Sequence, residues 1–448
     1  MKFSAVLDHA WAEDPGSPTA LGRDLRLVRA AAQELLALDV PASSYAELAA
    51  SYRPDRQDRS ARQDRSDRSP RSGGITAVVL THNEEQVIGA CLRALTDDCD
   101  RVLLVDSGSD DSTLRTAKAA VARVEHVTRA WTDDFAAQRN AAFERVRPGG
   151  WLAHVDADET LSAESRGRLR AVLSALDHAL PGADLVVSPR VLDTSRECHT
   201  NTRRVLRSHT ALRFRGRVHE RPYDAHGAEP PCVEVDVTFH HTGYEPEVIA
   251  RKGKRERYTR LIERCLAEEP SNPKWHFYAV RDGMVGRKPG PDEARSLYGR
   301  LEEARALYGA RPLSDYEKER LADSLVLQCE LALGFGGGRE IQELAPLLRD
   351  RGRLLEASYY QAFAEFGALL NRSSHLLDQL AEDTRHELPG GRLLAGRSYD
   401  LQALLALTCG RYDDVPRLLE EARSRQAGAL TTGAVESLAA LLPGRRER

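Results

Sequence analysis

The segment HVDADE, residues 154–159, places three carboxylates within four positions, directly after the apolar run WLAHV at 151–155. A run of this length is typical of a buried strand, so Asp156 and Asp158 should lie at its carboxyl end. Residues two apart in an extended segment point the same way, and neighbouring like charges need a cation or hydrogen bonds to offset them. Mg²⁺ and Mn²⁺ suit carboxylate oxygens. Asp156 and Asp158 are therefore candidate ligands of Mg²⁺ or Mn²⁺, and an acidic turn in solvent is the alternative interpretation.

Strands that could position these residues alternate with helical patterns. The runs ITAVVL (75–80) and RVLLV (101–105) have the length of buried strands, like WLAHV. Between them, EEQVIGACLRAL (84–95) and STLRTAKAAVARV (112–124) have helical periodicity. Such alternation predicts an α/β domain with a doubly wound, mostly parallel sheet. Ligands bind such sheets at the carboxyl ends of the strands.

The other strand ends are polar as well. The first ends in THNEE (81–85) and the second in DSGSDDS (106–112). Asp106 is suited to accept hydrogen bonds from a ribose or a base, and the Ser/Gly/Asp segment after it allows a tight turn. Arg139 in AAQRNAAF could neutralise a phosphate oxygen, or it could be an ordinary surface arginine. Three polar strand ends in succession favour one ligand site over three independent surface turns.

The rest of the chain divides into parts that differ in composition and in the spacing of their apolar residues. In VEVDVTFHHTGY (233–244), Val233, Val235, Val237, Phe239 and His241 share one face of an expected strand. Beyond residue 247 the aromatic and alanine placements resemble tetratricopeptide units, without a clean 34-residue period. We expect four parts: a helical arm (1–52), a polar Asp/Arg/Ser linker that cannot bury a core (53–74), the α/β domain (75–250) and an all-α helical domain (251–448).

Composition limits the function classes. The 448 residues predict about three domains. A net charge of −4 gives no global signal for nucleic-acid binding, and the apolar runs are far shorter than a membrane span. The N-terminus becomes acidic too early for a signal peptide. The seven cysteines form no CxxC pair, which favours reduced thiols in a cytoplasmic protein.

Four motifs, in this order and spacing, resemble family 2 glycosyltransferases with the GT-A fold. They are VVLTHNEEQVIGACLRAL, VLLVDSGSDDST, DDFAAQRNAAF and WLAHVDADE. The continuation through RFRGRVHE and VTFHHTGY, followed by tetratricopeptide-like helices, is similar to one bacterial subgroup. That subgroup contains lipopolysaccharide-core glycosyltransferases and glycocin-type peptide S-glycosyltransferases. The catalytic resemblance covers roughly residues 75–280.

The resemblance implies a role for each motif. The residues of the first motif that would line the base and ribose pocket are Thr81, His82, Asn83 and Glu84. His82 stands where many relatives have tyrosine. Those expected to bind the rest of the sugar nucleotide or its metal are Asp106 (base or ribose), Arg139 (phosphate), Asp156 with Ala157 (ribose, and metal through Asp156), Asp158 (metal and diphosphate) and His241 (metal or diphosphate). The alternation of side chains along the strand does not decide which histidine faces the sugar nucleotide, so His240 is the alternative to His241.

The resemblance also implies an inverting reaction. A sugar would pass from a UDP- or GDP-linked donor to a peptide side chain, a glycan or a natural product, while a divalent metal stabilises the departing diphosphate. Glu220 in GRVHE is the candidate general base, with Asp224 as the second candidate. A salt bridge from Glu220 to Arg217 or Arg221 is the structural alternative.

Two other functions stay open. A sugar-nucleotide-forming nucleotidyltransferase also uses a doubly wound sheet, but it would want a Gly-rich basic loop where this chain has the acidic THNEE. A degenerate transferase could serve as a scaffold that binds partners through its helical repeat. The helical domain would support the acceptor site or, as the peptide-glycosylating relatives imply, form a homodimer.

Overall fold

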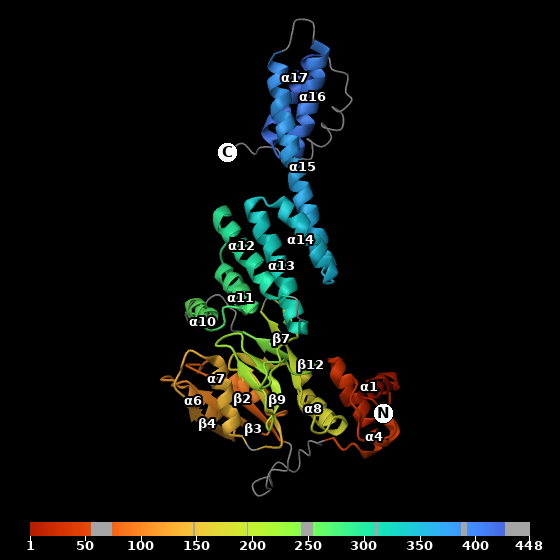
Figure 1. Ribbon diagram of the computed structural model, residues 1–448, viewed down its shortest axis with the longest axis vertical. Helices are drawn as coiled ribbons and strands as arrows, with labels where there is room; N and C mark the ends of the chain where they lie inside the picture. The colour runs from red at the N-terminus through yellow and green to blue at the C-terminus, as the bar shows by residue number, and fades with distance from the viewer. Residues whose placement is uncertain are drawn as a thin grey trace. The chain divides into compact units, whose positions relative to one another are not determined.

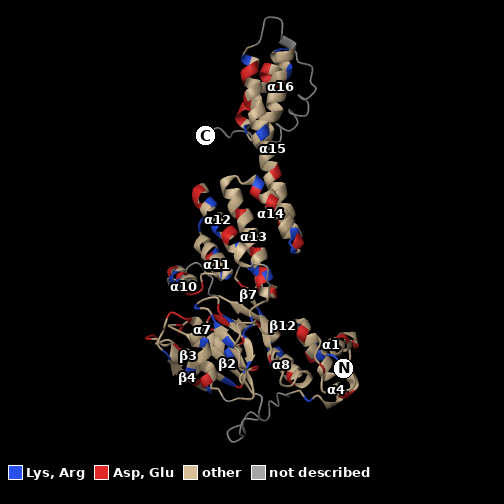
Figure 2. Cartoon of the chain, viewed as in Figure 1, with Lys and Arg blue, Asp and Glu red and all other residues tan. Residues whose placement is uncertain are grey.

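The computed structural model describes residues 1–54, 74–146, 148–194, 196–242, 254–309, 312–386 and 392–425. The chain forms two compact units, Met1–Pro270 and Ser271–Arg448 (Figure 1). Residues 55–73, which are most of the expected linker, lie outside the described residues. Basic and acidic side chains are interspersed over both units, in keeping with the small net charge (Figure 2).

The first unit is built on a ten-stranded sheet with the strand order β1-β12-β7-β9-β5-β2-β3-β4. The strands on this path are β1 (Val28–Ala31), β2 (Ile75–Thr81), β3 (Arg101–Asp106), β4 (Val124–Thr128), β5 (Trp151–Asp156), β7 (Val186–Asp193), β9 (Val205–Arg207) and β12 (Cys232–His241). Strands β2, β3, β4 and β5 are parallel to one another, and β12 is parallel to β7. Strand β9 runs antiparallel to both β5 and β7, and β1 runs antiparallel to β12. Two short strands extend this sheet, and a separate hairpin lies beside it: β6 (Glu159–Leu161) pairs with β12, β8 (Cys198–His199) with β7, and β10 (Arg213–Arg215) with β11 (Arg221–Tyr223).

Helices cover both faces of this sheet, which explains why β2 has buried, mostly apolar side chains on both of its faces. Ala77 and Val79 face the large core, whereas Val78 faces a second cluster with Leu103 and Leu152. The helices of this α/β part are α5 (Ile88–Ala94), α6 (Thr113–Ala120), α7 (Phe135–Asn140) and α8 (Arg168–Ala179), with short 3-10 turns at Ala141–Glu144 and Ala163–Ser165. The expected α/β class with a mostly parallel sheet is confirmed.

Residues 1–52 pack against this sheet. They form the helices α1 (Phe3–Ala12), α2 (Ala20–Leu25), α3 (Gln33–Leu36) and α4 (Tyr45–Ser51). Phe3, Leu25 and Leu48 belong to the same core as the sheet. Between these helices, β1 adds an antiparallel edge strand to β12, a strand that the sequence pattern did not predict. VRAA buries only Val28, so it lacks the alternation of a half-buried strand.

One further helix, α10 (Lys254–Glu268), belongs to the first unit although its residues fall in the expected helical domain. Side-chain contacts attach it to the α/β part. The Tyr258 ring packs edge-on against Phe135 and His219, and Arg217 forms a fork of hydrogen bonds with Glu268.

The second unit is helical, as expected. Its helices are α11 (Pro273–Met284), α12 (Pro291–Leu307), α13 (Asp315–Phe335), α14 (Gly338–Asp350), α15 (Leu354–Arg385), α16 (Arg392–Thr408) and α17 (Val415–Ser424), with a 3-10 turn at Tyr412–Asp414. From α11 to α17, each helix packs against the next one in the chain. Within the described ranges, no helix is both long enough and apolar enough to cross a membrane.

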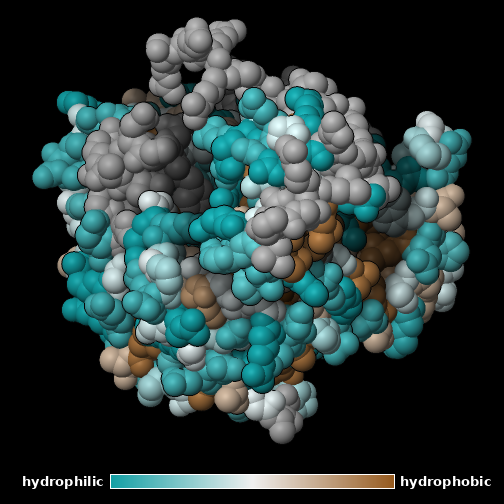
Figure 3. Space-filling view, turned by 90° about the horizontal axis from the view of Figure 1, so that it is seen from above, coloured by the Kyte–Doolittle hydropathy of each residue, from teal (hydrophilic) through white to brown (hydrophobic). Residues whose placement is uncertain are grey.

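Helix α15 exposes an apolar face. No side chain between residues 361 and 372 is buried. Its exposed large apolar residues are Leu354, Leu355, Tyr359, Phe363, Phe366, Leu369 and Leu376. By contrast, the face of the molecule in Figure 3 is largely hydrophilic, with apolar side chains in small patches.

Candidate active site

The polar strand ends meet at one edge of the sheet. In the parallel ladders of β2, Thr81 pairs with Asp106 of β3 and Leu80 pairs with Asp156 of β5. Because these strands run in the same direction, their carboxyl ends and the loops that follow lie side by side. The expected grouping of the THNEE, DSGSDDS and HVDADE segments is therefore present in the fold.

Asp106 organises the loop that follows β3. Its carboxylate accepts hydrogen bonds from the Thr81 and Ser109 hydroxyls, at 3.1 and 2.6 Å, and from the amides of Gly108 and Ser109, both at 3.0 Å. Burial raises the pKa of Asp106, but these hydrogen bonds outweigh it and hold the pKa below its usual value. A carboxylate has about four acceptor positions, so the chain itself uses them. Asp106 therefore shapes the loop that a nucleotide would contact.

The THNEE loop is held against this shaped loop. The amide of Asn83 donates to the Ser109 hydroxyl at 2.9 Å, and the amide of Glu84 donates to the Thr113 hydroxyl at 2.7 Å. His82 directly precedes these anchored positions, and its side chain is exposed. The loop thus presents an imidazole to solvent from a fixed backbone, where a base or ribose could be contacted.

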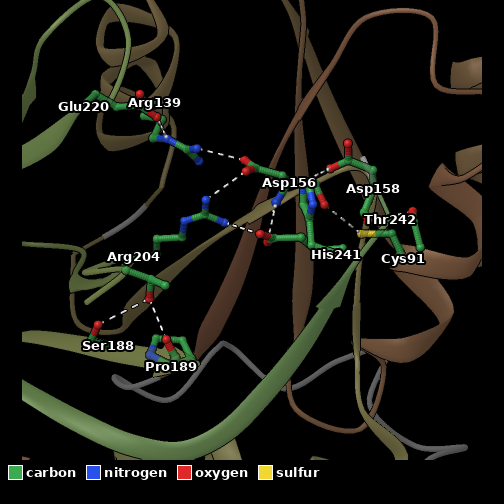
Figure 4. Close-up of polar contacts among 12 residues, drawn as sticks. Cys91, Arg139, Asp156, Asp158, Ser188, Pro189, Arg204, Glu220, His241 and Thr242 are labelled. Carbon is green, nitrogen blue, oxygen red and sulfur yellow. Dashed lines mark hydrogen bonds and ion pairs between the residues drawn. The ribbon is translucent and has the colours of Figure 1, made fainter. Parts of the chain in front are cut away.

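The two aspartates of HVDADE face different partners. Strand β5 ends at Asp156, and the chain turns at Ala157 and Asp158 instead of continuing extended. Asp158 lies 3.3 Å from the His241 imidazole (Oδ1 to Nε2), whereas Asp156 faces two arginines (Figure 4). The sequence argument that residues two apart point the same way does not apply here, because the turn rotates the second carboxylate away from the first.

Asp156 is held between two guanidinium groups. Arg139 donates to Oδ1 at 2.8 Å, and Arg204 lies 3.0 Å from Oδ2. The side chain keeps 29% of its surface exposed, so the carboxylate is still reachable. Burial raises its pKa, but the positive charges of Arg204 and Arg139 outweigh this effect and hold the pKa far below its usual value. Asp156 is therefore ionised at every physiological pH.

Arg139 connects Asp156 to Glu220. It projects from α7, and its Nε donates to Glu220 Oε1 at 2.6 Å while its Nη2 binds Asp156 (Figure 4). Its side chain is only 5% exposed, so it is no surface arginine. The alternative salt bridge from Glu220 to Arg217 is absent in the described structure, since Arg217 pairs with Glu268. Arg139 thus brings the candidate base and the end of β5 together.

Asp224, the second candidate base, has a different role. Its carboxylate accepts hydrogen bonds from the amides of His226 and Ala228, both at 2.8 Å, and closes an exposed turn. Arg221 nearby binds Asn201 through its guanidinium. Among the described contacts, none connects Asp224 to the Arg139 network.

The structure separates the two candidate histidines. His241 lies on the buried face of β12, opposite Glu159 of β6, and His240 is exposed. Burial lowers the pKa of His241, but the carboxylates of Asp158, Glu159 and Asp156 outweigh it and raise the pKa above its usual value. His241 is thus the member of the pair that lies beside Asp158.

Sequence reasoning missed two residues of this network, Glu159 and Arg204. Arg204 Nη1 donates to Glu159 Oε1 at 2.5 Å, and the amide of Asp156 donates to Glu159 Oε2 at 3.0 Å. Glu159 belongs to the HVDADE motif, so its position was a usable signal. No periodicity marks Arg204, because it lies just before β9 and its neighbour Arg203 has a φ of 50°.

Backbone strain concentrates around these residues. Among the described residues, five that are not glycine have a positive φ, which costs energy and is frequent at functional sites. Two of them directly precede residues of the network, Arg203 before Arg204 and His219 before Glu220, and two lie in segments that contribute to the site, Asn83 in THNEE and Asp133 two residues before α7.

The residues present fit a divalent ion in part. Asp158 and His241 offer a carboxylate and an imidazole close together, and Mg²⁺ needs only one or two carboxylates besides substrate phosphates. Asp156 uses both its oxygens on arginines. In the described part of the chain, one group of three metal-ligating side chains has its ligand atoms within 4.8 Å of one another: Asp193, Glu197 and His199, at the end of β7. Two of these three are exposed.

The comparisons with known proteins agree with this geometry. Residues 76–234 match the family described as "Glycosyl transferase family 2". The chain is 28% identical over 320 residues to the SPbeta prophage-derived glycosyltransferase SunS of Bacillus subtilis, covering 70% of this chain and 72% of SunS. It is 27% identical over 205 residues to a TPR repeat-containing protein of Synechococcus elongatus, covering 44% of this chain and 49% of that protein.

Among solved structures, residues 1–349 of S. aureus TarS align at 12% identity with a TM-score of 0.31, covering 64% of this chain and 92% of that chain. The family match and the curated relatives identify the catalytic part: the chain carries a glycosyl transferase family 2 domain.

Proposed function

We propose that this chain transfers a sugar from a nucleoside-diphosphate sugar, UDP- or GDP-linked, to a side chain of a peptide or to a glycan, with inversion at the anomeric carbon. The observation that carries the proposal is the linked set Glu220, Arg139 and Asp156 at the carboxyl end of β5, inside the family 2 domain. Ligands bind doubly wound sheets at this edge.

The donor would lie over the loops that follow β2 and β3. The fixed THNEE backbone and the loop shaped by Asp106 would contact the base and ribose. Arg139 and Arg204 supply the positive charge nearest to Asp156, so the diphosphate would meet guanidinium groups that lie among carboxylates.

Asp158 and His241 would hold Mg²⁺ or Mn²⁺, with the remaining ligands coming from the diphosphate and water. When bound, the ion stabilises the negative charge that develops on the leaving diphosphate. Asp156 would act beside this site, as a hydrogen-bond acceptor for the ribose, because its carboxylate is engaged by the two arginines.

Glu220 would take the proton from the acceptor. Its side chain is 11% exposed, and Arg139 fixes one of its oxygens, which leaves the other available to an acceptor hydroxyl or thiol. As the acceptor oxygen or sulfur forms a bond to the anomeric carbon, the bond to the diphosphate breaks and its electrons leave with the diphosphate. General-base help contributes about 10²–10⁴-fold.

The two alternatives fit the residues less well. A nucleotidyltransferase would need a basic, Gly-rich loop after β2, where this chain has the acidic THNEE. A degenerate scaffold would not need a base, an arginine and an aspartate linked by hydrogen bonds of 2.6 and 2.8 Å in a reachable site.

The experiment is a binding and transfer assay with a panel of UDP- and GDP-sugars, with and without Mn²⁺. We expect nucleoside diphosphate to bind more tightly with Mn²⁺, and Asp158→Asn to abolish that metal effect. Asp193→Asn is the matched control, because it removes one carboxylate from the exposed group at the end of β7. Loss of the metal effect in Asp193→Asn alone would indicate that the ion binds at that group instead.

A matched pair of variants tests the transfer step. Glu220→Gln should lower kcat about 10²–10⁴-fold, as expected for loss of a general base. Asp224→Asn removes a carboxylate four residues away that only closes a turn, and kcat should change little. Pyrophosphate-dependent nucleotide synthesis in place of sugar transfer would support the nucleotidyltransferase, and absence of any nucleotide-sugar binding would support the scaffold.

We also propose that two copies associate through α15. A helix that is apolar over most of its circumference is normally buried, and Tyr359, Phe366 and Leu369 are each more than half exposed. Glu365 and Arg372 lie seven residues apart on one flank of this face. In an antiparallel pair of α15 helices, Glu365 of one copy would meet Arg372 of the other. The face therefore complements itself, as a two-fold dimer requires.

The seven cysteines are all free. Thiols kept reduced are typical of the cytoplasm, which is the compartment we propose.

A further inference from the structure

We propose that Arg204, together with Glu159, positions Asp156 and the turn that carries Asp158, and that the transfer site depends on this pair. The inference rests on the proposed function. It adds two residues to the site, and both act through the contacts that they make with Asp156.

Arg204 and Glu159 hold Asp156 from both ends. Arg204 lies 3.0 Å from the Asp156 carboxylate and donates to Glu159 at 2.5 Å. The other oxygen of Glu159 accepts the amide of Asp156 at 3.0 Å. The three residues thus form a closed ring, in which the side chain and the backbone of Asp156 are both fixed. Figure 4 shows the part of this ring in which Arg204 faces Asp156.

The backbone around Arg204 is built for this arrangement. Arg203 adopts a left-handed φ of 50°, and its amide donates to the Ser188 hydroxyl at 2.9 Å. The carbonyl of Arg204 accepts the amide of His154 at 2.9 Å, which joins it to β5 two residues before Asp156. A strained residue that persists next to a multiply bonded one indicates that the surrounding structure enforces the position.

The chemistry of the ring requires a guanidinium. Glu159 is 1% exposed, so its charge must be paired inside the protein, and Asp156 needs a second cation opposite Arg139. A guanidinium can donate to two carboxylates at once, whereas an ammonium is a point charge that cannot bridge them in the same geometry. Without the bridge, the turn that carries Asp158 would be held only by the pairing of β6 with β12 and by the hydrogen bonds from Thr242 to the Asp158 carbonyl, so the Asp158 carboxylate would be placed less firmly beside His241.

The test compares Arg204→Lys with the wild type in the full-length chain. Isothermal titration of UDP and of GDP in Mn²⁺ gives the dissociation constant, and sugar transfer gives kcat and KM. We expect the dissociation constant of the Mn²⁺ complex to rise about 10–100-fold, as supporting residues of metal sites typically show. Binding of the same nucleotide without Mn²⁺ should weaken far less, because the turn chiefly positions Asp158.

A second variant, Glu159→Gln, also tests whether the Arg204–Glu159 pair positions Asp156. It keeps the shape of the side chain and removes the charge that Arg204 binds, so it should weaken Mn²⁺-dependent binding by a similar factor. Because the two residues act as one unit, the double variant Arg204→Lys/Glu159→Gln should lose little more than either single variant. If Arg204→Lys does not fold, Glu159→Gln decides alone.

Arg207→Lys is the matched control. Arg207 is a buried arginine at the end of β9, three residues after Arg204 in the chain, and it binds Asp177 and two backbone carbonyls away from the site. Its substitution should lower the melting temperature and leave the Mn²⁺ effect unchanged. The inference is overturned if wild type binds nucleotide with Mn²⁺ and the Arg204 and Glu159 variants do so equally well, or if Arg207→Lys loses the effect as well. Absence of binding by the wild type would overturn the proposed function itself, and this inference with it.

Discussion

Removal of the Arg139 guanidinium tests whether the site is held together by buried charge pairs. In Arg139→Met the side chain keeps a similar apolar volume but no longer pairs with Glu220 or Asp156. Arg139 is 5% exposed and Glu220 11%, so water reaches Glu220 only in part and replaces little of the lost donor. Asp156, at 29% exposed, retains Arg204 and some contact with solvent.

The expected cost follows from these exposures. Removing one partner of a buried ion pair costs about 3–5 kcal/mol, because it leaves an uncompensated charge in a poorly solvated place. Only Glu220 is left fully unpaired in this way, so we expect about 3 kcal/mol. In a unit of this size, 1 kcal/mol lowers Tm by about 2–4 °C, which predicts a decrease of about 6–12 °C. Calorimetry and urea unfolding of the full-length chain would measure it.

The control is Arg217→Met. Arg217 binds Glu268 with a comparable fork of hydrogen bonds, but Glu268 is 53% exposed, so this surface pair should contribute only about 0–1 kcal/mol. Adding Glu220→Gln to Arg139→Met should restore part of the lost stability, because the unpaired charge is then gone. Equal losses in Arg139→Met and Arg217→Met, or a double variant no more stable than Arg139→Met alone, would refute the reasoning.

Three other predictions concern pH, the N-terminal arm and α15. The pKa of Asp106 is lower in the folded protein than in the unfolded chain. Its ionised form therefore contributes stability that is present above the unfolded pKa of about 3.9 and lost as the pH falls further. In urea unfolding between pH 6 and pH 3, the free energy of unfolding should decrease less in Asp106→Asn than in the wild type. Leu25→Ala should cost about 2–5 kcal/mol, because Leu25 is fully buried in the core shared by arm and sheet, and a cost below 1 kcal/mol by urea unfolding would mean that the arm is not part of that core. Phe366→Glu should convert dimers to monomers in light scattering after gel filtration, with Leu394→Glu, another exposed apolar position, as the control; a wild type that is monomeric at every concentration would contradict the dimer.

Local patterns predicted most of the sheet and the assembly of the site edge. The runs that became β2, β3 and β5 are buried on both faces, so their composition alone indicated parallel strands. Strand β1 was not predictable, because VRAA has no alternation and its pairing depends on β12, about 200 residues later in the chain. The orientation of Asp158 depends on a turn, and that of Arg204 on one left-handed residue. Neither is a periodic feature, so periodicity could not indicate them.

The pairing of β1 with β12 has a consequence for synthesis on the ribosome. Arg29 and Asp236, which form an ion pair across this edge, are separated by 207 positions in the chain. At about 5–20 residues per second, the arm leaves the exit tunnel roughly 10–40 s before its partner strand. Throughout that interval β1 has no partner strand, and α2 lacks α8, a helix that it packs against, until residue 179 is made. The nascent chain should therefore be a client of chaperones that shield apolar segments, until translation passes residue 241.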